Sequence, residues 1–149
     1  MDYKLLCKQL KGFVEADPYF IPVMANASAL LWEELDEINW AGFYIVRDGQ
    51  LVLGPFQGKT ACIHIQKGKG VCGTAWEKDS IMVVRDVHEF EGHIACDAAS
   101  RSEIVVPIHS GAQVVAVLDI DSPITDRFSE DDKSGLIEFA RIIEEKICW

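Results

Sequence analysis

Residues 102–121 of the chain read SEIVVPIHSGAQVVAVLDID. Two apolar runs, Ser102 to His109 and Gln113 to Asp121, flank the link Ser110-Gly111-Ala112. A three-residue link that contains glycine between two such runs is typical of a β-hairpin. The sequence therefore predicts two neighbouring antiparallel strands joined by a three-residue turn.

Three acidic side chains lie on this predicted hairpin. A three-residue turn pairs His109 with Gln113. In that register Glu103 lies opposite Asp119, and both share a face with Asp121, whereas a slip by one residue would turn Glu103 to the other face. Because like charges placed opposite each other are unfavourable, the cluster implies a bound cation, a shared proton or screening by solvent. The residues alone also fit a solvated sheet end.

Helical periodicity is found at both ends of the chain. Apolar residues at helical spacing predict one helix before Pro18, which breaks the pattern, and a second helix over residues 23–35. Acidic residues after Ser129 form a capping-type start for a helix near the C-terminus. A further short helix is expected at residues 74–78.

Aromatic and β-branched residues predict more strands between these helices. Residues 38–46 and 50–53 flank Asp48-Gly49, which is typical of a tight hairpin turn. Shorter strands are expected at 61–66 and 81–84. Helices at both ends with hairpins between them predict the α+β class, with an antiparallel sheet covered by helices.

Length and charge narrow the class of protein. The 149 residues are enough for one domain, spanning 1–149, that buries its own core. A net charge of −10, from 14 basic and 24 acidic residues, repels phosphate backbones and anionic membranes, so we expect neither nucleic acid nor a membrane as a partner. The N-terminus lacks the apolar core of a signal peptide, and no apolar run reaches about 18 residues. We therefore expect a cytoplasmic protein.

Three of the five cysteines, Cys62, Cys72 and Cys96, stand in loop-like sequence surroundings. The segment around Cys96, GHIACDAASRSE at residues 92–103, is too small and polar for a core and suits a reactive thiol. An odd number of cysteines fits no framework of structural disulfides, so any disulfide is expected to be transient and catalytic. The spacing lacks pairs such as C-x-x-C, and we expect no metal site.

The glycine pattern at residues 68–73 does not predict a nucleotide cofactor. It matches G-x-G-x-x-G but lies outside a βαβ unit, so no cofactor is expected. Backbone N–H groups at the start of the following short helix could instead hold a carboxylate or a developing oxyanion. Four histidines are candidate general bases, although a surface or packing role is the more common explanation for a lone histidine: His64, His88, His93 and His109.

Six segments together carry a family resemblance. They are NWAGFY (39–44), LGPFQGK (53–59), GVCGTA (70–75), DVH (86–88), the run from Gly92 to Pro107, and VLDIDS (117–122). These segments resemble the GAF-domain free methionine-(R)-sulfoxide reductases. The similarity spans roughly residues 20–145 and includes all three loop cysteines.

The resemblance implies a GAF fold with a six-stranded antiparallel sheet. It also implies an enzyme that reduces the R-epimer of free methionine sulfoxide and is recycled through an intramolecular disulfide and thioredoxin. By the family pattern Cys96 is the nucleophile, Cys62 is the resolving partner, and Cys72 is an alternate or relay thiol. The sequence leaves open which of Cys62 and Cys72 is the main resolving thiol.

The resemblance also assigns a substrate pocket. The family's acidic residues fall on Glu103, Asp119 and Asp121, the carboxylates that the hairpin brings together. Its aromatic pocket residues fall on Trp40 and Tyr44, which share one face of a predicted strand. The oligomeric state stays open, a homodimer included.

A function from another class is also compatible with a GAF domain. A non-catalytic GAF sensor would bind a small ligand and signal to a partner, but it would need neither three loop cysteines nor an acid cluster. A cysteine hydrolase is disfavoured because no histidine has a spacing that singles it out as the base.

Overall fold

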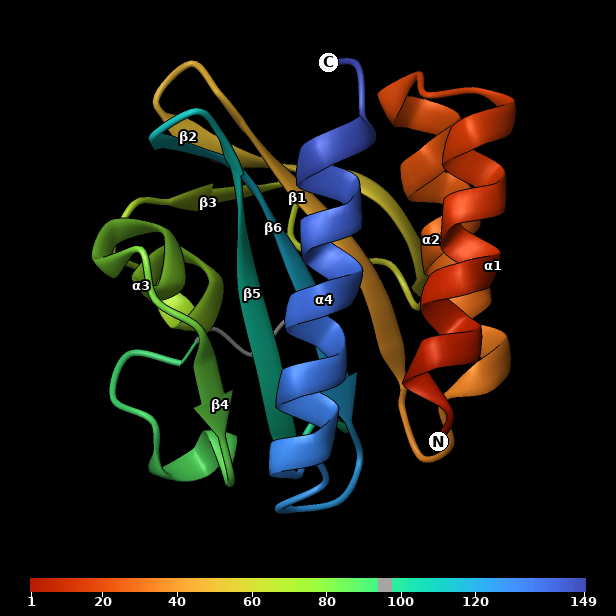
Figure 1. The fold of residues 1–149 in the computed structure, drawn as a ribbon. Helices are drawn as coiled ribbons and strands as arrows, with labels where there is room; N and C mark the ends of the chain where they lie inside the picture. The colour runs from red at the N-terminus through yellow and green to blue at the C-terminus, as the bar shows by residue number, and fades with distance from the viewer. Residues whose placement is uncertain (94–97) are drawn as a thin grey trace.

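The computed structural model describes residues 1–93 and 98–149, which form one antiparallel sheet with helices on both faces (Figure 1). The strand order across the sheet is β3-β2-β1-β6-β5-β4. The strands are β1 (Trp40–Arg47), β2 (Gln50–Gly58), β3 (His64–Gln66), β4 (Met82–Val84), β5 (Ser102–Ser110) and β6 (Gln113–Ser122). The α+β class and the six-stranded antiparallel sheet are therefore confirmed.

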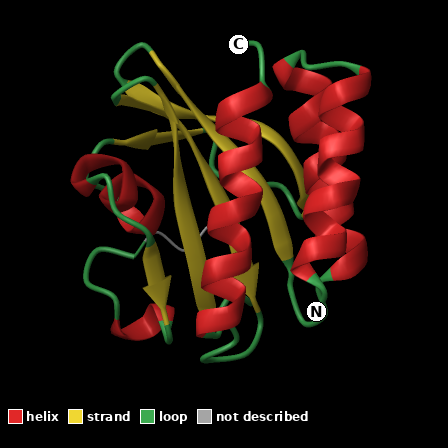
Figure 2. Ribbon diagram, viewed as in Figure 1, coloured by secondary structure: helices red, strands yellow, loops and turns green. Residues whose placement is uncertain are grey.

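Three long helices cover one face of the sheet, and one short helix packs on the other (Figure 2). The long helices are α1 (Tyr3–Ala16), α2 (Phe20–Glu34) and α4 (Glu130–Lys146); the short one is α3 (Gly70–Lys78), and a 3-10 turn, η1, spans Val87–Glu89. The predicted start of α4 is confirmed, because Ser129 and Asp132 form a reciprocal capping box. Within the described ranges, no helix is long and apolar enough to cross a bilayer.

The sheet separates two apolar cores. Side chains alternate along each strand, so Ala41 and Phe43 of β1 face α1, α2 and α4, while Trp40 and Tyr44 face α3. The first core is large and contains aliphatic and aromatic side chains from all three long helices. The second is smaller; it contains Cys72 and borders the pocket that Glu103 and Asp119 line. The functional groups therefore lie on the α3 face.

The hairpin of β5 and β6 differs from the prediction in its register. Its turn has two residues, so Ser110 pairs with the first residue of β6, and β6 accommodates one extra residue, Val115. As a result Glu103 pairs with Asp121, and the prediction that it lies opposite Asp119 is wrong. The shift amounts to two residues in total, which preserves the side-chain alternation, so the three acids still share one face.

The surroundings of Cys72 also differ from the prediction. The short helix begins at Gly70, earlier than expected, and Cys72 lies in its first turn with only 4% of its surface exposed. Gly73, one of the glycines that suggested an open loop, serves close packing instead. A Cβ at Gly73 would lie 2.5 Å from the carbonyl oxygen of Gln66, so only glycine lets α3 approach β3 this closely. Cys72 is therefore a core thiol.

His109 has a structural role in the described part of the molecule. Its ring nitrogens lie 2.6 Å from Asp79 Oδ1 and 2.7 Å from Glu144 Oε1. Burial alone would lower the pKa of His109, but the hydrogen bonds to the two carboxylates outweigh it and raise the pKa. The imidazolium thereby links β5 to α4 and to the end of α3, away from the acid cluster.

Candidate active site

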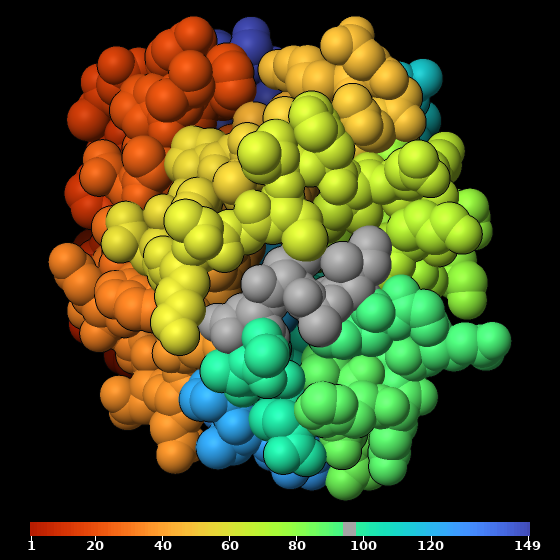
Figure 3. Space-filling view, turned by 180° about the vertical axis from the view of Figure 1, so that it is seen from behind, coloured from red at the N-terminus to blue at the C-terminus, as the bar shows by residue number. Residues whose placement is uncertain are grey.

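A pocket opens on the α3 face of the sheet and collects side chains from distant parts of the sequence. Its lining comes from β1, from the connection between β2 and β3, from the start of α3, and from β5 and β6. The connection (yellow) and the segment that follows β4 (green) both reach this face of the molecule (Figure 3). Predicted site residues that line the pocket are Trp40, Tyr44, Cys72, Glu103, Asp119 and Asp121.

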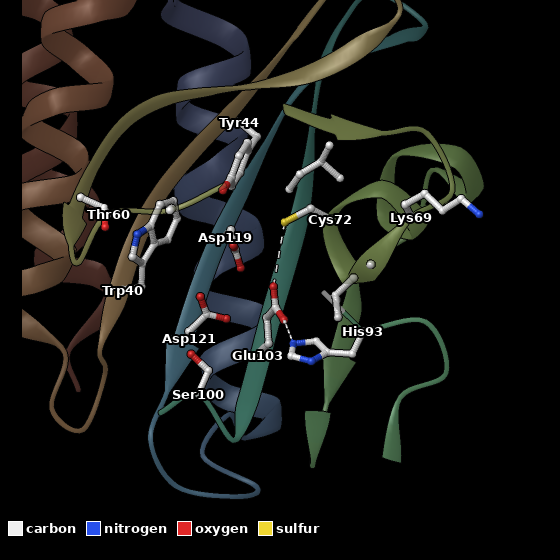
Figure 4. Close-up of a pocket in the computed structure, with 14 residues that line it drawn as sticks. Trp40, Tyr44, Thr60, Lys69, Cys72, His93, Ser100, Glu103, Asp119 and Asp121 are labelled. Carbon is white, nitrogen blue, oxygen red and sulfur yellow. Dashed lines mark hydrogen bonds and ion pairs between the residues drawn. The ribbon is translucent and has the colours of Figure 1, made fainter. Parts of the chain in front are cut away.

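The floor of the pocket is acidic. Glu103 of β5 and Asp119 of β6 are 6% and 5% exposed, and they lie beside the Cys72 thiol (Figure 4). The thiol donates to Glu103 Oε1 over 3.9 Å, and one ligand atom from each of these three residues lies within 4.8 Å of the others. Asp121 completes the cluster at the half-buried edge of the pocket. The sequence prediction that these carboxyl groups converge is therefore confirmed by their positions.

Burial makes this cluster hold protons. Burial, and then the charges of Asp119 and Asp121, raise the pKa of Glu103 well above its ordinary value. Burial also raises the pKa of Asp119 to about 6, although hydrogen bonds with Glu103 and Cys72 oppose the rise. The pKa of the Cys72 thiol is raised well above its ordinary value by burial and by the neighbouring carboxylates. At neutral pH we therefore expect a protonated Glu103 beside an ionised Asp119.

One oxygen of the cluster lacks a hydrogen-bond donor. Asp119 Oδ1 is buried and has no hydrogen-bond partner among the described residues. Lys69 lines the pocket, but its side chain points away from the carboxyl groups (Figure 4). A buried carboxylate oxygen without a donor costs about 1–3 kcal/mol, a penalty that a ligand with an N–H group would relieve. The floor of the pocket therefore suits a cationic amine.

The same atoms could in principle hold a soft divalent cation. Cys72, Glu103 and Asp119 come from three different elements, so no short sequence spacing could have predicted the grouping. Metal ligands must be deprotonated, however, and burial raises the pKa of both the Cys72 thiol and the Glu103 carboxyl. A cation would have to displace both protons, whereas an ammonium group could bind the existing arrangement.

Aromatic rings form the wall opposite α3. The rings of Trp40 and Tyr44 stack with centroids 5.8 Å apart, and Phe56 stacks on the other side of Trp40 at 5.1 Å. Phe56 was not predicted as part of the site. It reaches Trp40 because β2 approaches β1 so closely that a Cβ at Gly42 would lie 2.3 Å from the Cβ of Phe56. The wall suits an apolar group or a sulfur-bearing methyl group.

The cysteines are in different states. Cys62 lies in the connection between β2 and β3, packs against the same core cluster and is disulfide-bonded. Cys7, Cys72 and Cys148 carry free thiols. Cys96, the predicted nucleophile, lies outside the described residues. The predicted roles of the loop cysteines therefore stay predictions.

Two further polar residues reach the pocket. His93 Nε2 lies 3.9 Å from Glu103 Oε2, and burial lowers the pKa of this histidine, which is therefore mostly neutral near pH 7. Ser100 is buried and its hydroxyl accepts from the side-chain amide of Asn39 over 3.2 Å. The sequence did not predict the contact of His93 with Glu103, because their proximity arises from the tertiary fold.

Comparisons with known proteins agree with this arrangement. A GAF-domain family model matches residues 24–146. Free methionine-R-sulfoxide reductase of Escherichia coli is 48% identical over 146 residues, covering 98% of this chain and 88% of that protein. The structure of fRMsr of Staphylococcus aureus in complex with substrate has a TM-score of 0.94 and 52% identity, covering 99% of this chain and 96% of that one. A putative GAF sensor protein from Burkholderia vietnamiensis is also similar, with a TM-score of 0.94, 50% identity, and coverage of 97% and 92%.

The fold is that of a GAF domain, with a pocket on one face of its sheet. Within that class, the chain belongs to the free methionine-R-sulfoxide reductase family, a family of enzymes.

The raised pKa of Asp119 predicts a pH-dependent cost of folding. The folded state holds this proton up to about pH 6, whereas an unfolded aspartate loses it near 3.8, so the contribution of Asp119 to stability is most favourable at low pH and falls between these values. The full penalty is about 3 kcal/mol. We expect Asp119→Asn to gain stability relative to wild type as the pH rises from 4 to 7, as measured by urea unfolding at each pH. Asp126→Asn, which removes a surface partner of Arg85, is the control and should show no such rise; a flat difference for Asp119→Asn would contradict the assigned pKa.

Proposed function

We propose that this chain reduces free methionine-(R)-sulfoxide to methionine by thiol chemistry, with Cys96 as the nucleophile and Cys62 as the resolving thiol. A dithiol protein of the thioredoxin type would return the disulfide to two thiols. The observation that carries the proposal is the buried pair of Glu103 and Asp119, one protonated and one lacking a donor, on the floor of an aromatic-walled pocket. This pair matches the ammonium and the sulfoxide oxygen of one small molecule.

The substrate's three polar groups each have a counterpart. Its ammonium would donate to Asp119 and Asp121, and the protonated Glu103 would donate to the sulfoxide oxygen. Its carboxylate would accept from the backbone N–H groups at the start of α3, where Gly70 and Val71 line the pocket and no side chain caps the helix. Its S-methyl group would lie against Trp40 and Tyr44.

The proposed reaction proceeds in three balanced steps. First, the Cys96 thiolate attacks the sulfoxide sulfur, the oxygen is protonated and passes to Cys96 as a sulfenic acid, and methionine leaves. Second, the Cys62 thiolate attacks that sulfenic sulfur, an S–S bond forms and the S–O bond breaks, and the oxygen leaves as water. Third, the external dithiol exchanges with the disulfide and becomes oxidised in its place. The disulfide-bonded state of Cys62 supports its resolving role.

Cys72 is assigned the secondary role. Burial and the neighbouring carboxylates raise its pKa well above the ordinary value, and its hydrogen atom is engaged by Glu103, so it is a poor nucleophile. Its buried place in α3 also keeps an external dithiol away from it. We therefore expect Cys72 to act as an alternate or relay thiol.

The setting of the reaction follows from its chemistry. A reducing cytoplasm would keep the cysteines as thiols between cycles and would supply the dithiol partner. A homodimer is compatible with the proposal and is not required by it.

A non-catalytic GAF sensor is the alternative function, and one relative is called a putative GAF sensor protein. A sensor would bind the sulfoxide without producing methionine.

The ammonium interaction predicts selectivity for the free amino acid. N-acetylation removes the positive charge and leaves Asp119 without its donor, a loss of about 2 kcal/mol or more in a desolvated site. We expect kcat/KM for free methionine-(R)-sulfoxide to exceed that for the N-acetyl-(R) compound by well over tenfold. The free S-epimer should also be poor, because only one configuration directs the oxygen at Glu103 once the ammonium and the methyl group are fixed.

An NADPH-coupled assay with thioredoxin and thioredoxin reductase measures these rates. Glu103→Gln and Asp121→Asn, tested on the free R-epimer, should each lower kcat/KM. Equal rates on free and acetylated substrate would contradict the ammonium interaction, and near-normal rates in both amide variants would remove the acids from the mechanism. Binding of the sulfoxide with no methionine formed would favour the sensor.

Because the thiols are proposed to have different roles, their serine variants should behave differently in a single turnover. Cys96→Ser should release no methionine, whereas Cys62→Ser should release about one methionine per site and then cycle poorly with thioredoxin. Cys72→Ser should retain both phases if Cys72 is only an alternate thiol. Quenched-flow counts of methionine decide between these outcomes, and a full burst from Cys96→Ser would overturn the nucleophile assignment.

A further inference from the structure

The segment that carries Cys62 has little secondary structure of its own. Between the end of β2 at Gly58 and the start of β3 at His64, the chain is neither helix nor strand. One backbone hydrogen bond, from Leu53 N to Ile63 O at 2.9 Å, fixes its far end. Irregular segments of this kind depend on side-chain hydrogen bonds for a defined position.

Two aromatic side chains from β1 supply such bonds. Tyr44 Oη donates to the carbonyl oxygen of Cys62 over 2.9 Å, and Trp40 Nε1 donates to the carbonyl oxygen of Lys59 over 3.2 Å. The donors are themselves rigid, because Tyr44 and Trp40 are 2% and 3% exposed and stack on each other. Burial raises the pKa of Tyr44, so its hydroxyl remains a donor throughout the physiological range.

The two rings therefore have two sides with different contacts. Their faces line the pocket, as Figure 4 shows, while their polar ends hold the connection that includes Cys62. A bond to the carbonyl of Cys62 itself fixes the residue whose sulfur must reach its partner. Disulfide formation demands narrow limits on the separation of the two Cα and Cβ atoms. A displaced Cys62 would therefore slow the resolving step.

We propose that the Tyr44 hydroxyl is a positioning group for the resolving step, separate from the role of the Tyr44 ring in binding substrate. This inference rests on the proposed function. In the affected step the Cys62 thiolate attacks the sulfenic sulfur of Cys96, the S–S bond forms, and the sulfenic oxygen leaves as water. The hydroxyl takes no part in the bond changes; it holds the Cys62 backbone where the attack can occur.

Tyr44→Phe separates the two roles, because it keeps the ring and removes only the donor. We expect the burst of methionine in a single turnover to keep its amplitude, and its rate constant to fall less than the rate constant of disulfide formation. The rate constant of disulfide formation should fall by about tenfold, as expected for the loss of one buried hydrogen bond. Rapid quenching with a sulfenic-acid trap and counting of free thiols measure this step, since the sulfenic stage consumes one thiol and the disulfide stage two.

Tyr3→Phe is the matched control. Tyr3 donates to Asp132 over 2.6 Å on the opposite face of the sheet, so the variant loses a partly buried hydroxyl bond without touching the pocket. It should lower stability and leave both steps unchanged. Disulfide formation at the wild-type rate in Tyr44→Phe, or equal slowing of the burst and of disulfide formation, would overturn the proposal. A wild-type enzyme that releases no methionine would instead contradict the proposed function.

Discussion

The site depends on two carboxyl groups, those of Glu103 and Asp119, buried side by side away from any lysine or arginine partner among the described residues. Burying them costs stability, and that cost raises both pKa values. The sheet keeps them together because β5 and β6 are adjacent and carry the acids on one face. The same electrostatic constraint keeps the neighbouring Cys72 protonated and leaves Asp119 ready for a donor from a ligand.

The sequence correctly predicted that the three acidic side chains lie on one face of the sheet, but it predicted the wrong partner for Glu103 across the strands. A register shift by an even number of residues leaves every side chain on the same face of the sheet. The observed shift is two residues, so Glu103, Asp119 and Asp121 still lie on one face. The extra residue in β6 has no sequence signature of its own. Cys72 was placed in a loop because the glycines around it were interpreted as turn residues, whereas one of them, Gly73, allows a helix to pack closely on β3.

The aromatic rings of Trp40 and Tyr44 line the substrate pocket and also hydrogen-bond to the segment that carries Cys62. Trp40 and Tyr44 were predicted as pocket residues from the family resemblance, but their hydrogen bonds to the Cys62 segment depend on tertiary structure. Phe56 joins the wall only because Gly42 allows two strands to approach closely. In this arrangement one rigid stack of rings defines both the place of the substrate's methyl group and the place of the proposed resolving thiol.

The central claim is that the acid cluster binds a cationic amine, and the protons exchanged on ligand binding test it. Calorimetric titration of Cys96→Ser with free methionine-(R)-sulfoxide at pH 6, in buffers of different ionisation enthalpy, measures the protons released. An ammonium beside Asp119 lowers the pKa of that carboxyl from about 6, so binding should release on the order of half a proton per site, and Asp119→Asn should lose this release. Binding with no proton exchange, or with proton uptake, would contradict the account.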